Sequence, residues 1–233
     1  MNFVIPDLMF PSVPVRGAAD GARFPVRRIY CVGRNYVAHA VEMGFTGREP
    51  PFFFLKPGDA ALPVREGEVG RMRYPTLTSD LHHEVELVAA IGKGGSGIKA
   101  ADALSHVWGY AVGLDMTRRD LQADMKKQGR PWGIGKAFDE SAPIGEIRPA
   151  ADCRIDENTG IRLDVNGALR QRSTLGKLIW SLPEIIEHLA SAWTLAPGDL
   201  IFTGTPEGVA AVSRGDRLTA TVDGVGSLDV EIV

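Results

Sequence analysis

The stretch Thr78-Ser-Asp-Leu-His-His-Glu-Val-Glu-Leu-Val-Ala-Ala-Ile-Gly92 decides how the rest of the chain is interpreted. From Leu81 onward, its β-branched and apolar residues predict a strand. Side chains alternate between the faces of a strand, so Glu84 and Glu86 point the same way. Most such glutamate pairs lie on the solvated face of an amphipathic sheet, but the nearly continuous apolar residues here indicate burial on both faces. Because buried carboxylates need partners, we expect Glu84 and Glu86 to bind a hard metal ion.

The composition is that of an ordinary globular protein. The chain has 233 residues, of which 44% are hydrophobic and 24% charged, and its formal net charge is −3. This charge provides no basic face, which argues against nucleic acid as a partner, and no apolar run reaches membrane-spanning length. Cys31 and Cys153 form no metal-binding or redox motif, which favours a reducing compartment, the cytoplasm. Residues 1–15 contain no Lys or Arg, so we expect no signal peptide.

The sequence indicates one domain, residues 27–233, preceded by a short Pro-rich arm, residues 1–26. No internal repeat, low-complexity tract or linker divides it. The predicted elements are strands over 27–32, 50–56 and 110–114, a loop over 59–76, helices from Asp102 and from Thr117, a hairpin turning at Asn166-Gly167, and a helix begun by a Ser181–Glu184 capping box.

Polar residues near predicted strand ends supply further candidates for a site. Asp115 ends the strand over 110–114, where it would add a third carboxylate for the same cation. His39 and Glu42 are three apart on a helix-compatible segment, so they form either a surface pair or a water-activating dyad. Lys56 ends its strand either as a solvated lysine or as a cation for an anionic substrate.

Other residues could face the same site. Arg119 and Gln122 share one face of a predicted helix, which is either exposed to solvent or directed at the site. Lys136 lies in a Gly-rich segment that permits a close approach. His82 shares the glutamate face and is the better neighbour of the site, whereas His83 points away and is expected to be structural. All-oxygen ligation argues against zinc.

Six sequence blocks, running from about residue 27 to the C-terminus, carry a family resemblance. The blocks are Tyr30-Cys-Val-Gly-Arg-Asn-Tyr, Phe54-Leu-Lys-Pro, Asp80-Leu-His-His-Glu-Val-Glu-Leu, Gly113-Leu-Asp-Met-Thr-Arg-Arg-Asp, Lys136-Ala-Phe-Asp and Ile201-Phe-Thr-Gly-Thr-Pro. Together and in this order they resemble the fumarylacetoacetate hydrolase family. The likeness to its short acylpyruvate and fumarylpyruvate hydrolases extends to Phe52-Phe-Phe, Asp120-Leu-Gln and Arg130-Pro-Trp. The chain departs at Ala210-Ala211, where relatives often have Gly-Pro.

The resemblance implies a fold, a cofactor and residue roles. The implied fold is α+β and predominantly β, a rolled β-sandwich of mixed sheets with a few peripheral helices, usually in a homodimer. The implied cofactor is Mg²⁺, replaceable by Mn²⁺ or Ca²⁺. The matching positions are Glu84, Glu86 and Asp115 for the metal, His39 and Glu42 for the water-activating dyad, Lys136 for a near-metal lysine, Lys56 for a strand-end lysine, and Arg119, Gln122 and Thr205 for contacts with the substrate.

The activity that the resemblance implies is hydrolysis of the C–C bond of a 3-acylpyruvate. The expected substrate is fumarylpyruvate, a small oxo acid of gentisate-type aromatic degradation, which would give fumarate and pyruvate. Its second carboxylate needs a cation, for which Arg34, Arg71 and Arg73 are available, and Arg34 is assigned to the substrate. The alternative is decarboxylation of oxaloacetate, or tautomerisation or hydration of a related oxo acid, through the same enolate. A third possibility is a ligand-binding protein without catalysis.

Overall fold

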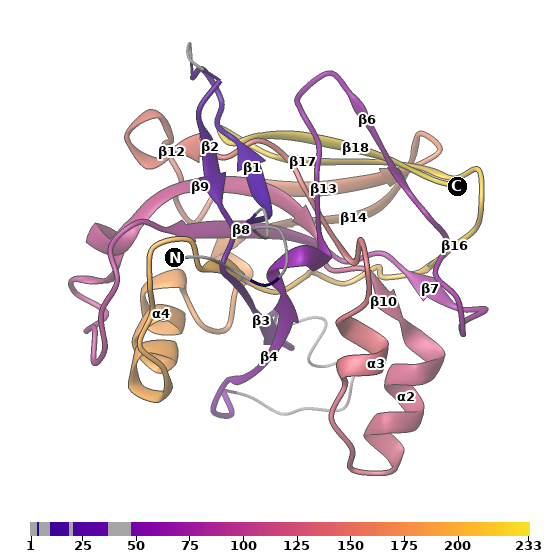
Figure 1. Cartoon of the computed structure of the whole chain (residues 1–233), viewed down its shortest axis with the longest axis horizontal. Helices are drawn as coiled ribbons and strands as arrows, with labels where there is room; N and C mark the ends of the chain where they lie inside the picture. Colours follow the sequence, from indigo (N-terminus) through magenta and orange to yellow (C-terminus); the bar gives the residue numbers. More distant parts are fainter. Residues whose placement is uncertain (1–3, 5–9, 19–20, 37–47) are drawn as a thin grey trace.

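The computed structural model describes residues 4, 10–18, 21–36 and 48–233, and most of their ordered structure is β (Figure 1). No helix in this part of the chain is long and apolar enough to cross a membrane. Cys31 is buried and Cys153 half-buried, and both are free thiols.

The larger of two main sheets is mixed and contains eight strands. In chain order these are β3 (Arg28–Gly33), β4 (Phe52–Pro57), β5 (Ala61–Pro63), β8 (Val85–Ile91), β9 (Val107–Leu114), β11 (Ala142–Ile144), β12 (Arg148–Pro149) and β15 (Leu200–Phe202). Their order across the sheet is β4-β3-β15-β8-β9-β11-β5, and β12 also pairs with β9. β3 and β15 are parallel, whereas β8 is antiparallel to both of its neighbours, β15 and β9.

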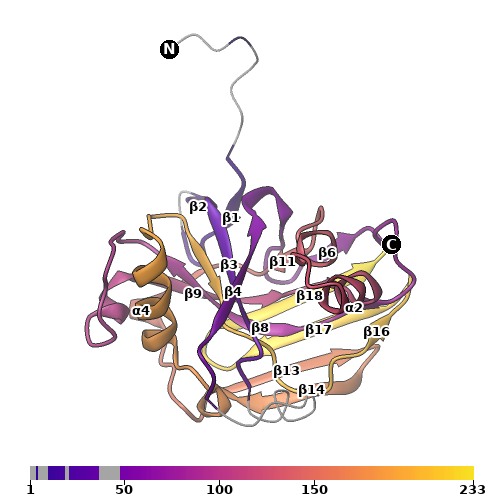
Figure 2. The same ribbon diagram turned by 90° about the horizontal axis from the view of Figure 1, so that it is seen from below.

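A second sheet of five strands packs against β8 and β9 (Figure 2). Its strands are β6 (Val69–Met72), β13 (Gly160–Val165), β14 (Ala168–Thr174), β17 (Arg217–Val222) and β18 (Gly226–Ile232). Their order is β14-β13-β17-β18-β6, with β6 parallel to β18. The two sheets form the mixed, predominantly β sandwich that was expected.

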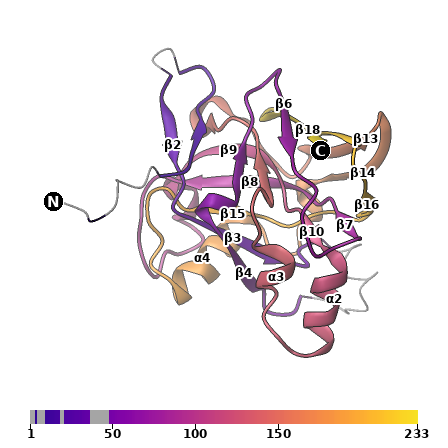
Figure 3. The same ribbon diagram turned by 45° about the vertical axis from the view of Figure 1, so that its right-hand side comes forward.

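Two smaller sheets complete the β structure. The first joins β10 (Thr117–Arg118), β7 (Leu81–His82) and β16 (Ala211–Val212), and Figure 3 shows it beside α2. The second is a hairpin of β1 (Ser12–Pro14) and β2 (Arg23–Pro25), from which Val13 and Phe24 pack into the interior. The boundary placed after residue 26 stays a prediction.

Helices lie at the periphery. Among the described residues, the α-helices are α2 (Arg119–Lys127), α3 (Gly133–Lys136) and α4 (Leu182–Ala192), and the 3₁₀ turns are η1 (Gly58–Ala60), η2 (Ala103–His106), η3 (Ala150–Asp152) and η4 (Leu175–Lys177). α2 and α3 pack together, whereas α4 lies apart from them and buries Ile185, Ile186 and Leu189 (Figure 1).

The larger sheet is covered on both faces. Val85, Leu87, Ala89 and Ile91 of β8 belong to a core shared with the second sheet and α4, whereas the intervening Val88 and Ala90 belong to a core on the opposite face. Every residue of β8 is buried, as its apolar sequence predicts. Glu86 shares the face of Val88 and Ala90, so its carboxylate is inside the protein and not on a solvated surface.

Two local predictions are confirmed. Asn166 and Gly167 both have positive φ, 53° and 77°, as the tight turn between β13 and β14 requires. Ser181 caps α4, and its backbone N–H donates to Oε2 of Glu184 at 2.9 Å.

The predicted continuous strand from Leu81 is wrong, because β7 and β8 belong to different sheets. The backbone N–H of His83 donates to the carbonyl of Ala210, whereas that of Val85 donates to the side chain of Gln171. The side-chain amide of Gln171, on β14, therefore takes the place of a backbone hydrogen-bond acceptor at this break.

Three other element predictions also differ from the structure. Thr117 does not cap a helix: its hydroxyl donates to Oε1 of Glu84 and to the carbonyl of Asp115, and Arg118 precedes α2 without a side-chain cap. The helix expected from Asp102 is only the turn η2. The expected loop over 59–76 contains η1, β5 and β6, whose strands pair with distant strands and are too short to show periodicity.

Candidate metal-binding active site

Residues from distant segments meet at one edge of the larger sheet. Because β8 runs opposite to β9 and β15, and β3 runs parallel to β15, the start of β8 lies beside the ends of the other three. Glu84 precedes β8, Asp115 follows β9, Arg34 follows β3 and Thr205 comes shortly after β15. The strand directions therefore gather these four side chains at one place.

Three carboxylates converge there. Glu86 pairs with Gly113 across the β8–β9 ladder, and the N–H of Asp115 donates to the carbonyl of Glu84 at 2.8 Å, which continues the same register. A Cβ on Gly113 would lie 2.5 Å from a methyl group of Val88 and 2.6 Å from the Phe202 ring, so this close strand packing requires glycine. Glu84, Glu86 and Asp115 are all buried, and a ligand atom of each lies within 4.8 Å of the others.

Backbone and side-chain donors orient the glutamates. The N–H of Gly204 donates to Oε2 of Glu86 at 2.6 Å, and the hydroxyl of Thr117 donates to Oε1 of Glu84 at 3.2 Å. Gly204 has a φ of 102°, and a Cβ at this position would lie 2.7 Å from Cβ of Asn35. Position 204 therefore requires glycine both for its conformation and for its close approach to Asn35.

Lys136 and Arg119 lie against these carboxylates. The Lys136 ammonium donates to Oε2 of Glu84 at 2.8 Å and to Oδ2 of Asp115 at 2.6 Å, and Arg119 donates to the other oxygen of Glu84. Burial disfavours the ammonium of Lys136, but the charges of Asp115 and Glu84 outweigh burial and raise its pKa. Lys136 is therefore a cation inside the site.

The packing of α3 against α2 places these groups. A Cβ on Gly135 would lie 2.9 Å from the backbone nitrogen of Gln122, so glycine permits the close approach. Gln122 is buried on the site-facing side of α2, and its side-chain oxygen accepts a hydrogen bond from Arg119 at 2.6 Å. The polar face of α2 is thus directed at the site.

Lys56 occupies a different place from the one predicted. Its ammonium is buried, lies 2.9 Å from Oδ1 of Asp115 and donates to the carbonyls of Met116 and Lys136. It is not among the described residues that line the cavity. Its contacts are structural: Lys56 supports Asp115 from behind and holds the backbone at Lys136.

The donor set fits a hard divalent cation. Glu86 is 2% exposed, and within residues 48–233 the only hydrogen bond to its carboxylate comes from the N–H of Gly204, with no ion pair to Lys or Arg. Burial, followed by the charges of Asp115 and Glu84, raises the pKa of Glu86 well above its usual range. Such crowded carboxylates are costly without a counter-charge. Oxygen-only ligands are those that Mg²⁺ and Mn²⁺ take.

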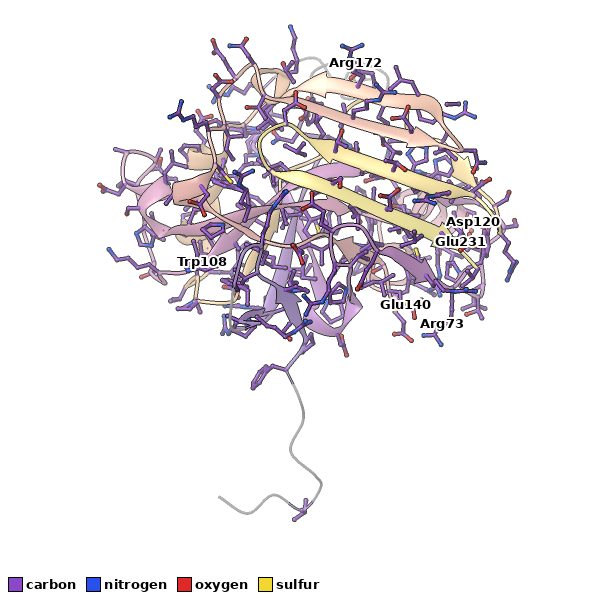
Figure 4. All side chains as sticks on the ribbon, turned by 90° about the horizontal axis from the view of Figure 1, so that it is seen from above. Arg73, Trp108, Asp120, Glu140, Arg172 and Glu231 are labelled. Atoms are coloured by element: carbon purple, nitrogen blue, oxygen red, sulfur yellow. The ribbon has the colours of Figure 1, made fainter. Side chains whose placement is uncertain are left out.

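One cavity unites the three carboxylates with most of the predicted contacts for a substrate. Its described lining is Val32, Gly33, Arg34, Phe54, Glu84, Glu86, Asp115, Arg119, Gln122, Trp132, Lys136 and Thr205. Arg34, Arg119, Gln122, Lys136 and Thr205 were all singled out from the sequence. The other two candidate arginines lie elsewhere: Arg71 is on β6 in the second sheet, and Arg73 pairs with Glu140 at 2.9 Å (Figure 4).

Sequence reasoning missed Gln171, which lies behind the site. Its side-chain oxygen accepts from Nδ1 of His83 at 2.9 Å and from the N–H of Val85, and its NH₂ donates to the hydroxyl of Thr205 and to the carbonyl of Pro206. It thus ties the start of β8 to the loop after β15. Its only sequence signal is an uncharged polar residue on the inward-facing side of β14.

His82 and His83 both contact residues that do not line the cavity. His83 contacts Gln171, as its predicted structural role requires. Nε2 of His82 lies 2.9 Å from Oδ1 of Asp80, and His82 is absent from the described lining of the cavity. Both predicted members of the water-activating dyad, His39 and Glu42, lie outside the described residues.

An aromatic wall was also missed. Trp132 meets Phe52 edge-on, with ring centroids 5.2 Å apart, and Phe54 at 5.9 Å, and the Lys136 ammonium lies 5.0 Å from the centroid of Phe54. Phe52-Phe-Phe and Arg130-Pro-Trp were noted only for their family likeness. No local pattern shows that two phenylalanines of β4 meet a tryptophan from the segment before α3.

A family model described as fumarylacetoacetate (FAA) hydrolase C-terminal matches residues 28–233. The chain belongs to this family. The predicted resemblance is confirmed, and so is the predominantly β fold.

Members of the fumarylacetoacetate hydrolase family that resemble this chain have different activities. The crystal structure of fumarylpyruvate hydrolase from Pseudomonas aeruginosa in complex with Mn²⁺ and pyruvate is 54% identical, with a TM-score of 0.96 over 100% of this chain and 99% of that one. The mitochondrial oxaloacetate tautomerase of Rattus norvegicus is 42% identical over 88% of this chain and 91% of the rat protein. The oxaloacetate tautomerase of Escherichia coli (strain K12) is 40% identical, over 86% and 90% of the respective chains.

Proposed function

We propose that this family member is a divalent-metal-dependent hydrolase of 3-acylpyruvates that converts fumarylpyruvate to fumarate and pyruvate. The observation that carries the proposal is the meeting of three buried carboxylates with Lys136, Arg119 and Gln122 in one cavity. The similarity to the Pseudomonas aeruginosa hydrolase supports the choice of substrate.

The reaction requires a site that accommodates growing negative charge. Hydrolysis joins the oxygen of water to the acyl carbonyl carbon and breaks the bond from that carbon to the methylene carbon. The electron pair departs as the enolate of pyruvate, which a proton converts to pyruvate. Fumarate leaves as the free acid anion. The site must therefore hold the pyruvoyl end and stabilise the enolate as it forms.

The residues divide this work. Glu84, Glu86 and Asp115 would hold the metal, which would supply Lewis-acid polarisation of the substrate's pyruvoyl group. Lys136 places a permanent positive charge beside the same carboxylates, where it stabilises the enolate oxygen. Arg119 and Gln122, already joined by a hydrogen bond, offer donors to the substrate carboxylate.

Water activation is assigned to His39 and Glu42 on the strength of the sequence alone. Glu42 accepts the proton of the attacking water, and His39 orients it. We further propose Mg²⁺ as the resident metal, a cytoplasmic location, a homodimeric state and a role in aromatic degradation of the gentisate type.

Incubation of the purified protein with fumarylpyruvate and Mg²⁺ or Mn²⁺ tests the function. Equal amounts of fumarate and pyruvate are expected, with loss of activity in EDTA and on Glu84→Gln. The matched control is Glu140→Gln, which changes an acid paired with Arg73 away from the cavity and is expected to retain activity. Folded, metal-binding protein that releases no pyruvate from fumarylpyruvate or acetylpyruvate would overturn the proposal.

A second candidate is oxaloacetate tautomerase, which the rat and Escherichia coli relatives favour. Moving a proton between the enol and keto forms uses the same enolate but breaks no C–C bond. The two candidates are separated by following enol absorbance and pyruvate release in parallel with each substrate. His39→Ala is expected to abolish C–C cleavage, whereas intact cleavage in this variant would contradict the assigned water activation.

A further inference from the structure

Thr205 is a buried residue of the cavity, and its hydroxyl accepts a hydrogen bond from the protein. It lines the same cavity as the three carboxylates, and its Oγ1 accepts from Nε2 of Gln171 at 2.8 Å. Within the described part of the chain, the hydroxyl proton itself is donated to no acceptor. The direction of that proton decides which ligand atoms Thr205 can bind, because a hydroxyl can either donate or accept.

Two backbone groups fix the orientation of the Gln171 amide. The N–H of Val85 can only donate, and it reaches Oε1 at 3.1 Å. The carbonyl of Pro206 can only accept, and it receives a hydrogen bond from Nε2 at 2.8 Å. The oxygen and the nitrogen of the amide therefore cannot be exchanged. One N–H of Gln171 points at Pro206, and the other points at the hydroxyl oxygen of Thr205.

His83 completes the contacts at the oxygen end. Its Nδ1 lies 2.9 Å from Oε1 of Gln171, and because an amide oxygen only accepts, Nδ1 carries a hydrogen. Two donors then meet the amide oxygen, and two acceptors meet the NH₂ group. Turning the amide over would set Val85 against an NH₂ group and Pro206 against an oxygen, and buried polar groups without partners are costly. The amide is therefore held in one orientation.

The loop after β15 is held close to both sheets. Gly208 has a φ of 91°, and a Cβ there would lie 2.2 Å from the carbonyl oxygen of Arg170, so glycine lets the loop lie directly on β14. On the other side, the N–H of Gly204 donates to the carboxylate of Glu86. Thr205 follows Gly204 in the chain, so its hydroxyl is held beside the candidate metal ligands.

We propose that Gln171, oriented by Val85, Pro206 and His83, is a positioning residue that makes the Thr205 hydroxyl a hydrogen-bond donor to an anionic oxygen of the ligand. The inference rests on the proposed function, in which that oxygen belongs to the pyruvoyl carboxylate. An N–H of Gln171 occupies one lone pair of the hydroxyl, so the hydroxyl proton is directed away from Gln171. A carboxylate oxygen accepts this proton, and the resulting hydrogen bond is a strong one because the acceptor is charged.

The test measures the binding of pyruvate, the proposed product, by calorimetry at saturating Mn²⁺. Thr205→Val keeps the shape of the side chain, removes the hydroxyl and is expected to weaken binding about 10- to 100-fold. Thr205→Ser keeps the hydroxyl and is expected to retain most of the affinity. Gln171→Glu keeps the shape of the amide, but its carboxylate accepts the Thr205 proton, so a loss of about 10- to 100-fold is expected here too.

The double variant separates positioning from a general structural effect. If Gln171 acts through the Thr205 hydroxyl, Gln171→Glu combined with Thr205→Val binds pyruvate no more weakly than Thr205→Val alone. Independent effects would instead multiply the two losses. Gln128→Glu makes the same chemical change at an exposed residue at the end of α2 and is expected to bind pyruvate like the wild type. Multiplied losses, or full affinity in Gln171→Glu, would overturn the proposal.

A measurement on the wild type covers the case in which Gln171→Glu does not fold. Nitrogen-15 NMR is expected to show a hydrogen on Nδ1 of His83. A bare Nδ1 would require the reversed amide and would overturn the proposal.

The proposed function is judged separately. If the wild type releases pyruvate from fumarylpyruvate but the losses multiply, the hydrolase stands and the role of Gln171 falls. Pyruvate binding with the expected coupling but without cleavage would have the opposite meaning. A wild type that binds no pyruvate in the presence of metal would overturn both.

Discussion

The ammonium of Lys56 lies 2.9 Å from Oδ1 of Asp115, and neither side chain is exposed to solvent. Asp115 is therefore a ligand candidate held between two lysines, because Lys136 contacts its other oxygen at 2.6 Å. The carbonyl of Lys136 in turn accepts a hydrogen bond from Lys56. Lys56 therefore couples the position of Asp115 to that of Lys136 and of helix α3, which carries it.

Lys56→Met is expected to lower the free energy of unfolding by about 3–5 kcal/mol, because it leaves the buried charge of Asp115 with one cation fewer. Urea denaturation measures this loss. The matched control is Lys99→Met, which breaks an exposed 3.2 Å pair with Glu187 and is expected to cost less than about 1 kcal/mol. Similar costs for the two variants would contradict the structural role assigned to Lys56.

Glu86→Gln tests the crowding of the carboxylates. Burial and the charges of Asp115 and Glu84 raise the pKa of Glu86 above its unfolded value, so the folded state retains a proton that the unfolded state releases. The stability linked to Glu86 is then complete below the unfolded pKa of about 4.3 and is lost as pH rises towards the folded pKa. In EDTA at pH 8, Glu86→Gln is expected to be more stable than the wild type, and the gap between the two proteins narrows at pH 5.

Adding metal is expected to make the wild type more stable than Glu86→Gln. Mg²⁺ or Mn²⁺ at 100 times its dissociation constant stabilises the wild type by about 2.7 kcal/mol, whereas Glu86→Gln gains little. Thermal unfolding with and without EDTA measures both effects. Equal stabilisation of the two proteins by metal would remove Glu86 from the ligand set.

Gln171→Leu is expected to destabilise the protein by about 3 kcal/mol, since it leaves several buried donors and acceptors unpaired at about 1–3 kcal/mol each. Weaker metal binding should accompany the loss, because Gln171 ties the start of β8 to Thr205. The neighbouring Arg172→Leu changes an exposed residue of β14 (Figure 4) and is expected to cost less than about 0.5 kcal/mol. Chemical denaturation measures the stability, and calorimetry measures the metal affinity. Unchanged metal affinity in Gln171→Leu would show that Gln171 does not support the metal site.

Gly204→Ala isolates the close approach beneath Glu86. Gly204 and Gly129 both have positive φ. Of the two, only Gly204 lies where an added Cβ would clash with another residue, 2.7 Å from Cβ of Asn35. Gly129→Ala is expected to cost about 1 kcal/mol. Gly204→Ala adds about 1–3 kcal/mol of overpacking and shifts the donor to Glu86, so its metal affinity should fall. Equal unfolding energies for the two variants would refute the steric argument.

Local sequence patterns predicted those parts of the fold that neighbouring residues control. The turn at Asn166-Gly167 and the cap at Ser181 depend on backbone conformation and hydrogen bonds within a few residues, and both were located correctly. The alternation of Glu84 and Glu86 on one buried face also survives, although the strand begins later than predicted. The break before Val85 was missed because its partner, Gln171, lies on another sheet.

The residue types of the candidate site follow from the amino-acid sequence: two glutamates at the start of one strand, an aspartate at the end of another, and the lysines and arginines around them. Which of these cations reach the cavity depends on the fold. Lys56 lies behind Asp115, Arg73 pairs with Glu140, and Arg34 lines the cavity with its guanidinium over the Phe52 ring. The chemistry of each side chain follows directly from the residue type. The distance between two side chains depends on the order and direction of the strands, which are set by pairing between distant segments.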